Sequence, residues 1–204
     1  MLISDKIACE DFPCEKINKE GYLIPDIDID IEEIKIIMIS EVPPEKPEDN
    51  FYAEGTPYYM ETTLQLFKDA GFDVSSINDI IDLGVYITTA IKCSKIGYSI
   101  PTSAIKICSE ILEKELDLFP NVKAYILNSD ASIKAFNYIA KRKTGEKAIP
   151  SGSTYKIRHN DFYYKESRVF PSYILTGKNL LIEKSKRKMI ADDIKRAFVY
   201  ATSN

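Results

Sequence analysis

The hydrophobic positions along the chain alternate between the pattern of buried strands and that of helices. Three short segments are almost continuously apolar or β-branched, which is typical of strands covered on both faces of a sheet: residues 34–39, 85–91 and 122–127. Four longer segments predict helices from apolar spacing or from their terminal residues: residues 57–70, 101–118, 130–143 and 183–200. Residues 155–162 and 168–173 predict two closing strands.

Residues that start or stop helices mark several of these boundaries. Pro57 opens the first predicted helix and Gly71 closes it. Asp130 is expected to cap a later helix that Gly145 ends. Residues 21–33 alternate apolar and acidic side chains, which predicts an extended segment of the edge-strand type with one buried face.

The alternation of buried strands with helices predicts an α/β fold, with a mostly parallel sheet between helices on both faces. We expect one domain over residues 1–204, in which residues 1–33 form an N-terminal segment that carries two cysteines. Functional residues of such sheets lie in the loops beyond the carboxyl ends of the strands. Those loops are expected to begin at Ser40, Lys92, Asn128 and Tyr173.

Composition places the chain among ordinary soluble proteins. Hydrophobic residues make up 45% of its 204 residues and charged residues 28%, which excludes the disordered and fibrous classes. No apolar run reaches the roughly 20 residues that a membrane span needs. The first residues carry an acid and a base and lack the apolar core of a signal peptide. We therefore expect a cytoplasmic monomer without a membrane partner.

Charge is distributed unevenly along the chain. Residues 1–50 hold 5 Lys and Arg against 14 Asp and Glu, whereas residues 141–188 hold 13 against 4. Such an asymmetry indicates a surface that faces a polyanion. Solvated lysines scattered over the surface are the alternative, and charge alone does not decide between the two.

The four cysteines form two pairs. Four residues separate Cys9 from Cys14 in an irregular N-terminal segment, and fourteen separate Cys93, which follows a predicted strand, from Cys108 in a helix. Four thiolates that converge from loops and helix turns suit an iron–sulfur cluster, and structural zinc takes the same ligands. Because neither pair has the C-x2-C spacing, four unrelated buried cysteines remain an alternative at this stage.

Several segments match the motifs of one enzyme family in the family's own order. They are Ser40-Glu41-Val42-Pro43-Pro44, Glu48-Asp49, Gly55-Thr56-Pro57-Tyr58, residues 85–93 ending in Lys92-Cys93, Lys156-Ile157-Arg158, and residues 170–176. In these segments, and in the distance from Cys93 to Cys108, the sequence resembles the iron–sulfur-containing uracil-DNA glycosylases of bacteria and archaea. The resemblance covers nearly the whole chain. The corresponding family motifs include a GEAPG loop, G-x-P-F, V-Y-I-T-N-x-x-K-C and F-P-T-Y-H-P.

The resemblance implies a fold, a cofactor and an activity. The fold is a three-layer α/β/α domain with a central, mostly parallel four-stranded sheet. The cofactor is a 4Fe-4S cluster held by Cys9, Cys14, Cys93 and Cys108, with structural zinc as the alternative, although C-x4-C replaces the family's usual first pair. The activity is base-excision DNA repair, in which a damaged base is flipped out of DNA and its N-glycosidic bond is hydrolysed.

Residue roles follow from the same resemblance. Glu41 matches the catalytic carboxylate, and Tyr58, Val42, Thr89 and Ile174 occupy base-binding positions. The residues expected to contact DNA are Ser172, Thr176, Lys178, Lys156 and Arg158.

The departures from the family fall on the chemistry. Thr89 replaces the asparagine that reads the uracil edge, and a hydroxyl offers one rotating group where an amide offers a donor and an acceptor. Ile174 replaces the histidine that donates to the departing base, and Ser40 and Pro44 replace two glycines. The substitute donors within the neighbouring loops are Thr176, Asn179, Ser172 and Asn128. Two hypotheses follow: a glycosylase for uracil or another deaminated base, or a degenerate member that binds nucleic acid or a nucleobase without cleavage.

Overall fold

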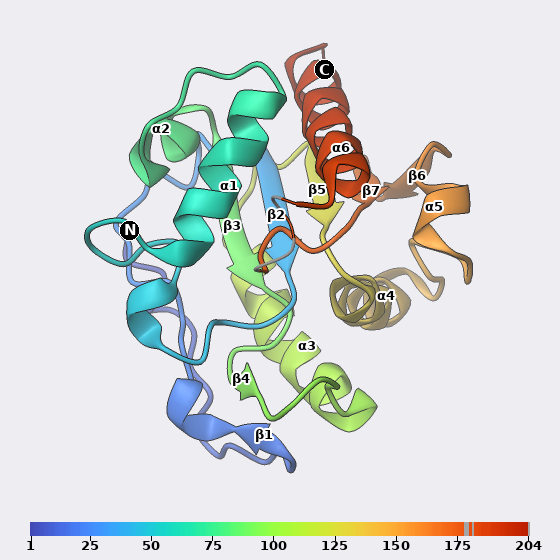
Figure 1. The fold of residues 1–204 in the computed structure, drawn as a ribbon. Coiled ribbons are helices and arrows are strands. Elements are labelled where there is room, and N and C mark those ends of the chain that lie inside the picture. Colours follow the sequence, from blue (N-terminus) through green and yellow to red (C-terminus); the bar gives the residue numbers. More distant parts are fainter. Residues whose placement is uncertain (178–179, 181, 204) are drawn as a thin grey trace.

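The computed structural model describes residues 1–177, 180 and 182–203 and builds them on a mixed, mostly parallel sheet (Figure 1). In spatial order its five strands are β3 (Val85–Thr89), β2 (Ile36–Ser40), β5 (Ala124–Leu127), β7 (Ser167–Pro171) and β6 (Phe162–Tyr164). The first four are parallel, and β6 pairs antiparallel with β7. The α/β class and the mostly parallel sheet are therefore confirmed, with five strands instead of the expected four.

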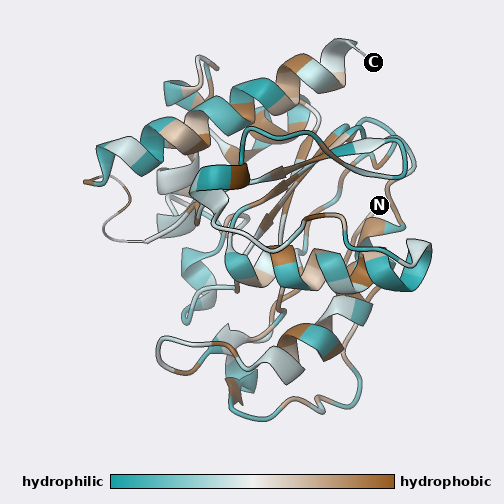
Figure 2. Cartoon of the chain, turned by 90° about the vertical axis from the view of Figure 1, so that its right-hand side faces the viewer, coloured by the Kyte–Doolittle hydropathy of each residue, from teal (hydrophilic) through white to brown (hydrophobic). Residues whose placement is uncertain are grey.

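Helices cover both faces of this sheet. One face carries α1 (Tyr58–Asp69), α2 (Ile77–Asp82) and α6 (Lys184–Ser203), and the other carries α3 (Thr102–Leu116) and α4 (Asp130–Thr144). All five residues of β2 are buried, with Ile37 and Ile39 in the core beneath α3 and α4. Ile36 and Met38 point into the core beneath α1 and α6. The hydrophobic strands accordingly lie between helices of mixed hydropathy (Figure 2).

The four helices predicted from the sequence are present, with differences at their ends. Ser129, and not Asp130, caps α4: its side chain accepts from the backbone N–H of Ser132, whose hydroxyl accepts in turn from the N–H of Ser129. Gly145 ends α4 in the left-handed conformation, as expected. The short helix α2 was not predicted, although Ser76 and Asp79 form a capping box at its start.

The N-terminal segment packs against the α3–α4 face with little regular structure. Its elements are β1 (Ile17–Asn18), which pairs antiparallel with β4 (Ser94–Lys95), and the 3-10 turn η1 (Lys19–Gly21). Gly21 lies so close to the Ser94 side chain that a Cβ would overlap it, so this approach requires glycine. The alternating burial predicted for residues 21–33 is present, with Ile29 buried between the exposed Asp28 and Asp30. The edge strand itself is wrong, because Asp28 only forms an isolated bridge with Leu2.

The strand predicted over residues 155–162 is also wrong. This segment forms the short helix α5 (Thr154–Ile157) and a turn, and β6 begins only at Phe162. A second 3-10 turn, η2 (Pro47–Asp49), follows β2. In the described part of the chain no helix is both long and apolar enough to cross a membrane.

Candidate functional site

The carboxyl ends of three parallel strands meet at one edge of the sheet. Ile39 of β2 is in register with Thr88 of β3 and Leu127 of β5, so Ser40, Thr89 and Asn128 lie at the same level. Ser40 Oγ and Asn128 Oδ1 are buried and have no hydrogen-bond partner among the described residues. Unpartnered buried polar atoms are rare in folded proteins and require an explanation, and here two lie on neighbouring strand ends.

Glu41 follows β2 directly, at the position that the parallel-sheet rule predicts. Its Oε2 lies 2.8 Å from Nζ of Lys95, and the two side chains are 20% and 34% exposed, so the carboxylate is reachable from solvent. Glu41 borders an open cleft of about 440 Å³ that Ser172, Ile174 and the first turn of α4 also line. This volume lies within the range of small-ligand sites, roughly 300–1,000 Å³.

A second hollow lies on the other side of the loop after β2. Val42, Lys95 and Tyr59 line it together with β1. Burial raises the pKa of Tyr59 and the nearby charge of Glu41 raises it further, while a hydrogen bond to Thr176 lowers it. Tyr59 is thus an aromatic residue near the catalytic candidate that the sequence analysis missed, although Tyr155 and Tyr173 line the Glu41 cleft itself. The Tyr58-Tyr59 pair at the start of α1 was the available signal.

The predicted stacking residue Tyr58 lies elsewhere on the same turn of α1. Burial raises its pKa, and Glu61 and Asp49, not Glu41, are the charges that add to the shift. Thr89 is buried at the end of β3. Neither residue is among the described residues that line the two hollows. Ile174 is 40% exposed and does border the cleft.

Several predicted DNA contacts are used inside the protein instead. Arg158 is buried, and its guanidinium binds Asp193 at 2.7 Å and Asp192 at 3.0 Å. Ser172 is buried as well and donates to Asp193 at 2.7 Å. Burial raises the pKa of Asp193, whereas these hydrogen bonds and charges lower it. Arg158 is therefore not placed to contact phosphates, in contrast to the prediction.

The remaining predicted contacts are partly accessible. Lys156 is exposed on α5, and Thr176 is half-buried beside Tyr59. Lys178 and Asn179 lie outside the described residues. The structure thus brings Glu41, Ser172 and Ile174 to one cleft and places Val42 in the adjoining hollow.

All four cysteines line one small cavity between the N-terminal segment, the loop after β3 and α3. Cys93 and Cys108 are buried, and Cys9 and Cys14 are half-buried. The loop between Cys9 and Cys14 turns through Phe12 at a φ of 43°, a conformation that a bulky side chain seldom adopts. The Phe12 ring packs edge-on against Tyr22, with ring centroids 4.8 Å apart, which holds this turn in place.

Burial in this cavity favours the protonated form of the two buried thiols, Cys93 and Cys108. Burial raises the pKa of Cys93 to about 12 and that of Cys108 to about 11, and the neighbouring sulfurs add to both shifts. The backbone N–H of Lys92 donates to Sγ of Cys108 at 3.2 Å. Among the described residues, no three His, Cys, Asp or Glu side chains lie close enough together to hold a single metal ion.

A buried ion pair joins the thiol cavity to the end of β3. Nζ of Lys92 binds the Glu115 carboxylate, Oγ1 of Thr88 at 2.7 Å and the carbonyl oxygen of Thr89 at 2.8 Å. Glu115 also accepts from Tyr86 and Thr88, each at 2.7 Å. The Lys92 ammonium therefore has three acceptors, and its backbone contacts a cysteine at the same time.

No family model matches the chain, and no curated protein sequence matches it significantly.

Proposed function

We propose that this chain is a DNA glycosylase of the uracil-DNA glycosylase type, with the corresponding three-layer α/β/α fold, that hydrolyses the N-glycosidic bond of uracil or another deaminated base. The supporting observation is the position of Glu41: a solvent-reachable carboxylate at the carboxyl end of a parallel strand, beside a cleft of ligand size. Ligands of open α/β sheets bind in this place.

The arrangement suits hydrolysis of a flipped nucleotide. Water adds to C1′ of the sugar as the C1′–N bond breaks, and the base leaves with the bonding electrons and takes up a proton. The Glu41 carboxylate stabilises the positive charge that develops on the sugar or orients the water. Tyr155 and Tyr173 line the Glu41 cleft and Tyr59 lies near it, so aromatic faces are available to a base. Ser40 Oγ and Asn128 Oδ1 are buried polar atoms at the neighbouring strand ends and have no partner among the described residues.

A panel of oligonucleotides tests the activity. We expect slow excision from single-stranded or mismatched DNA, where extruding the base costs least, for one of uracil, hypoxanthine and xanthine. The measurement is strand cleavage after alkaline treatment of the abasic product. Absence of any abasic product over long incubations, with binding retained, contradicts the glycosylase and supports the alternative of binding without cleavage.

One observation favours that alternative. Ile174, which borders the cleft, cannot donate a hydrogen bond to a departing base, and Ser172 is already bonded to Asp193. We expect Thr89→Asn combined with Ile174→His to raise uracil excision by about tenfold or more, mainly because the histidine restores a donor at the cleft, whereas position 89 lines neither hollow. Thr89→Val with Ile174→Leu is the matched control and should give no gain. A folded but inert Asn/His variant contradicts catalysis at this site.

We further propose that Cys9, Cys14, Cys93 and Cys108 hold a 4Fe-4S cluster with a structural role. The donor set fits, because four thiols line one cavity and a backbone N–H already points at one sulfur. In a cluster each thiolate binds a separate iron, so the sulfurs need not converge on one point. A single tetrahedral zinc needs all four around it, and in the described residues no such group is preformed.

Anaerobic purification tests the cluster. We expect brown protein with about four irons per chain, and colourless protein with one zinc supports the alternative instead. Cys93→Ala should remove the visible absorption and lower the melting temperature more than Ile105→Val, a trimming of the same core, because metal binding and folding are coupled. Equal losses in the two variants, or metal-free wild-type protein, contradict the cluster.

A further inference from the structure

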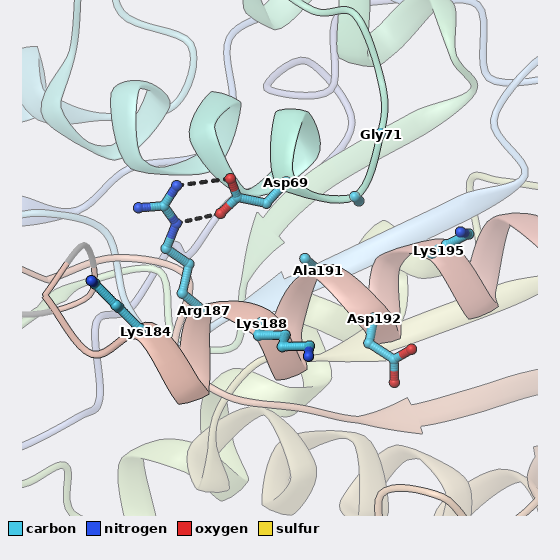
Figure 3. A pocket seen from close by; sticks show the side chains of 9 residues that line it. Asp69, Gly71, Lys184, Arg187, Lys188, Ala191, Asp192 and Lys195 are labelled. Atoms are coloured by element: carbon cyan, nitrogen blue, oxygen red, sulfur yellow. Dashed lines mark hydrogen bonds and ion pairs between the residues drawn. The ribbon is translucent and has the colours of Figure 1, made fainter.

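A third hollow of the molecule, which Glu41 does not line, carries a concentration of free positive charge. It is a groove of about 680 Å³ between the end of α1 and the outer side of α6, shown in Figure 3. Its small lining residues are Ala70, Gly71 and Ala191. Lys184, Lys188 and Lys195 follow one another along the α6 wall.

The acids of the groove are neutralised by other residues. Arg187 binds both oxygens of Asp69 across the groove, and Asp192 is bound to the buried Arg158 at 3.0 Å. The three lysines are exposed, and within the described part of the chain their side chains have no ion pair or hydrogen bond. The groove therefore presents three uncompensated positive charges in a protein whose net charge is −4.

The first turn of α6 carries positive charges, which are unfavourable at the N-terminal end of a helix. The first turn of α6 holds Lys184, Lys186 and Arg187 and no acid, although the positive end of the helix dipole favours acids there. Glu183 compensates Lys186 at 2.6 Å, and Asp69 compensates Arg187, but Lys184 stays uncompensated. A cation that lowers the stability of its own helix points to a binding role.

We propose that this groove binds the phosphodiester backbone of a DNA strand, next to the strand segment whose base enters the Glu41 cleft. At about 1.5 Å per residue, Lys184 and Lys195 lie about 16 Å apart along the helix, which matches a run of phosphates better than one isolated phosphate. Among the described residues, the lining holds no aromatic ring on which a base could stack and no large apolar side chain that would enter a membrane.

Continuity with the cleft supports the same occupant. Lys186, two residues from Lys184, borders the Glu41 cleft, so the first turn of α6 separates the two hollows. A strand that passes over this turn contacts both. The inference rests on the proposed function only in taking DNA as the partner, because backbone binding requires neither a damaged base nor excision.

The test is binding of an undamaged single-stranded oligonucleotide, followed by fluorescence anisotropy over a range of salt concentrations. We expect Lys184→Glu/Lys188→Glu/Lys195→Glu to weaken binding at low salt by about tenfold or more and to reduce the slope of log affinity against log salt by about 2. Lys106→Glu/Lys114→Glu/Lys134→Glu, which makes the same charge change at exposed positions of α3 and α4, is the matched control and should retain most of the affinity. If the glutamate variant does not fold, Lys184→Gln/Lys188→Gln/Lys195→Gln replaces it. This neutral variant should also bind DNA more weakly than the matched control.

The melting temperature of the single variant Lys184→Glu gives a second test, because it should change in the opposite direction to the DNA affinity. Lys184→Glu alone should raise the melting temperature while it weakens binding, because an acid suits the first turn of a helix. Equal losses of affinity in the groove and control variants, no binding of DNA by the wild type, or binding of anionic vesicles in place of DNA would each overturn the proposal. Groove-dependent binding without any excision would instead count only against the glycosylase activity.

Discussion

Lys92→Met is expected to lower the free energy of unfolding by about 3–5 kcal/mol, because it leaves the Glu115 carboxylate charged and buried without its cation. Both side chains are almost inaccessible, with exposed fractions of 1% and 0%. Methionine preserves the length and packing of the lysine stem, so the loss reports the missing ammonium and not a cavity. Urea unfolding followed by circular dichroism measures the change in midpoint.

A matched pair elsewhere in the chain provides the control. Lys95 also binds a glutamate, Glu41, but both side chains are partly exposed. Lys95→Met should therefore cost about 0–1 kcal/mol. Adding Glu115→Leu to Lys92→Met should recover part of the lost stability, since the unpaired charge is gone, although Tyr86 and Thr88 lose their acceptor. If Lys92→Met costs no more than Lys95→Met, the buried pair does not form as described.

The architecture of the sheet was predictable because its signals are local. A parallel strand covered on both sides is apolar at most positions, and residues 36–40, 85–89 and 124–127 are buried throughout. The loop positions followed from the same rule, which placed Glu41 at the edge where a ligand binds. The four cysteines, far apart in the sequence, line one cavity, although in the described residues no three of them form a preformed site for a single metal ion.

The errors arose where tertiary contacts decide local structure. Residues 21–33 alternate like an edge strand, yet in the described structure they pair with no strand of the five-stranded sheet, and isolated side chains such as Ile29 anchor the segment to the core. Residues 155–162 have apolar positions that fit a strand as well as a helical turn. The strands β1 and β4, two residues each, are too short for any periodicity.

The charged partners of the site could not be read from the sequence either. Lys95 lies 54 residues from Glu41, and Asp193 lies 35 residues from Arg158. Nothing in the local sequence distinguishes the buried Arg158 from an exposed one, so it was assigned to DNA. The groove between α1 and α6 could not be predicted from the sequence for the same reason: Gly71 and Lys188 line it together only when α6 packs on α1.

Glu41→Gln is expected to reduce excision of the preferred base by about 10²–10³-fold, which is the usual effect of removing one preorganised electrostatic group. Glutamine keeps the shape of the side chain and a hydrogen bond to Lys95, but it carries no charge to stabilise a positive sugar. Affinity for the undamaged oligonucleotide should stay within about twofold of the wild type. The negative Glu41 carboxylate makes no attractive contact with phosphates, so its replacement removes no binding contact. Single-turnover excision and anisotropy, measured on the same protein, separate these two effects.

Lys95→Gln distinguishes catalysis from simple support of the loop. It breaks the same ion pair as Glu41→Gln but leaves the carboxylate in place, at a similar small cost in stability. If Glu41 is the catalytic residue, Lys95→Gln retains excision within a few-fold of the wild type while Glu41→Gln loses it. If both variants lose activity equally, the ion pair positions the loop and the charge has no direct part in the reaction. Glu45→Gln, an exposed change in the same loop, should leave excision unchanged and controls for the altered net charge.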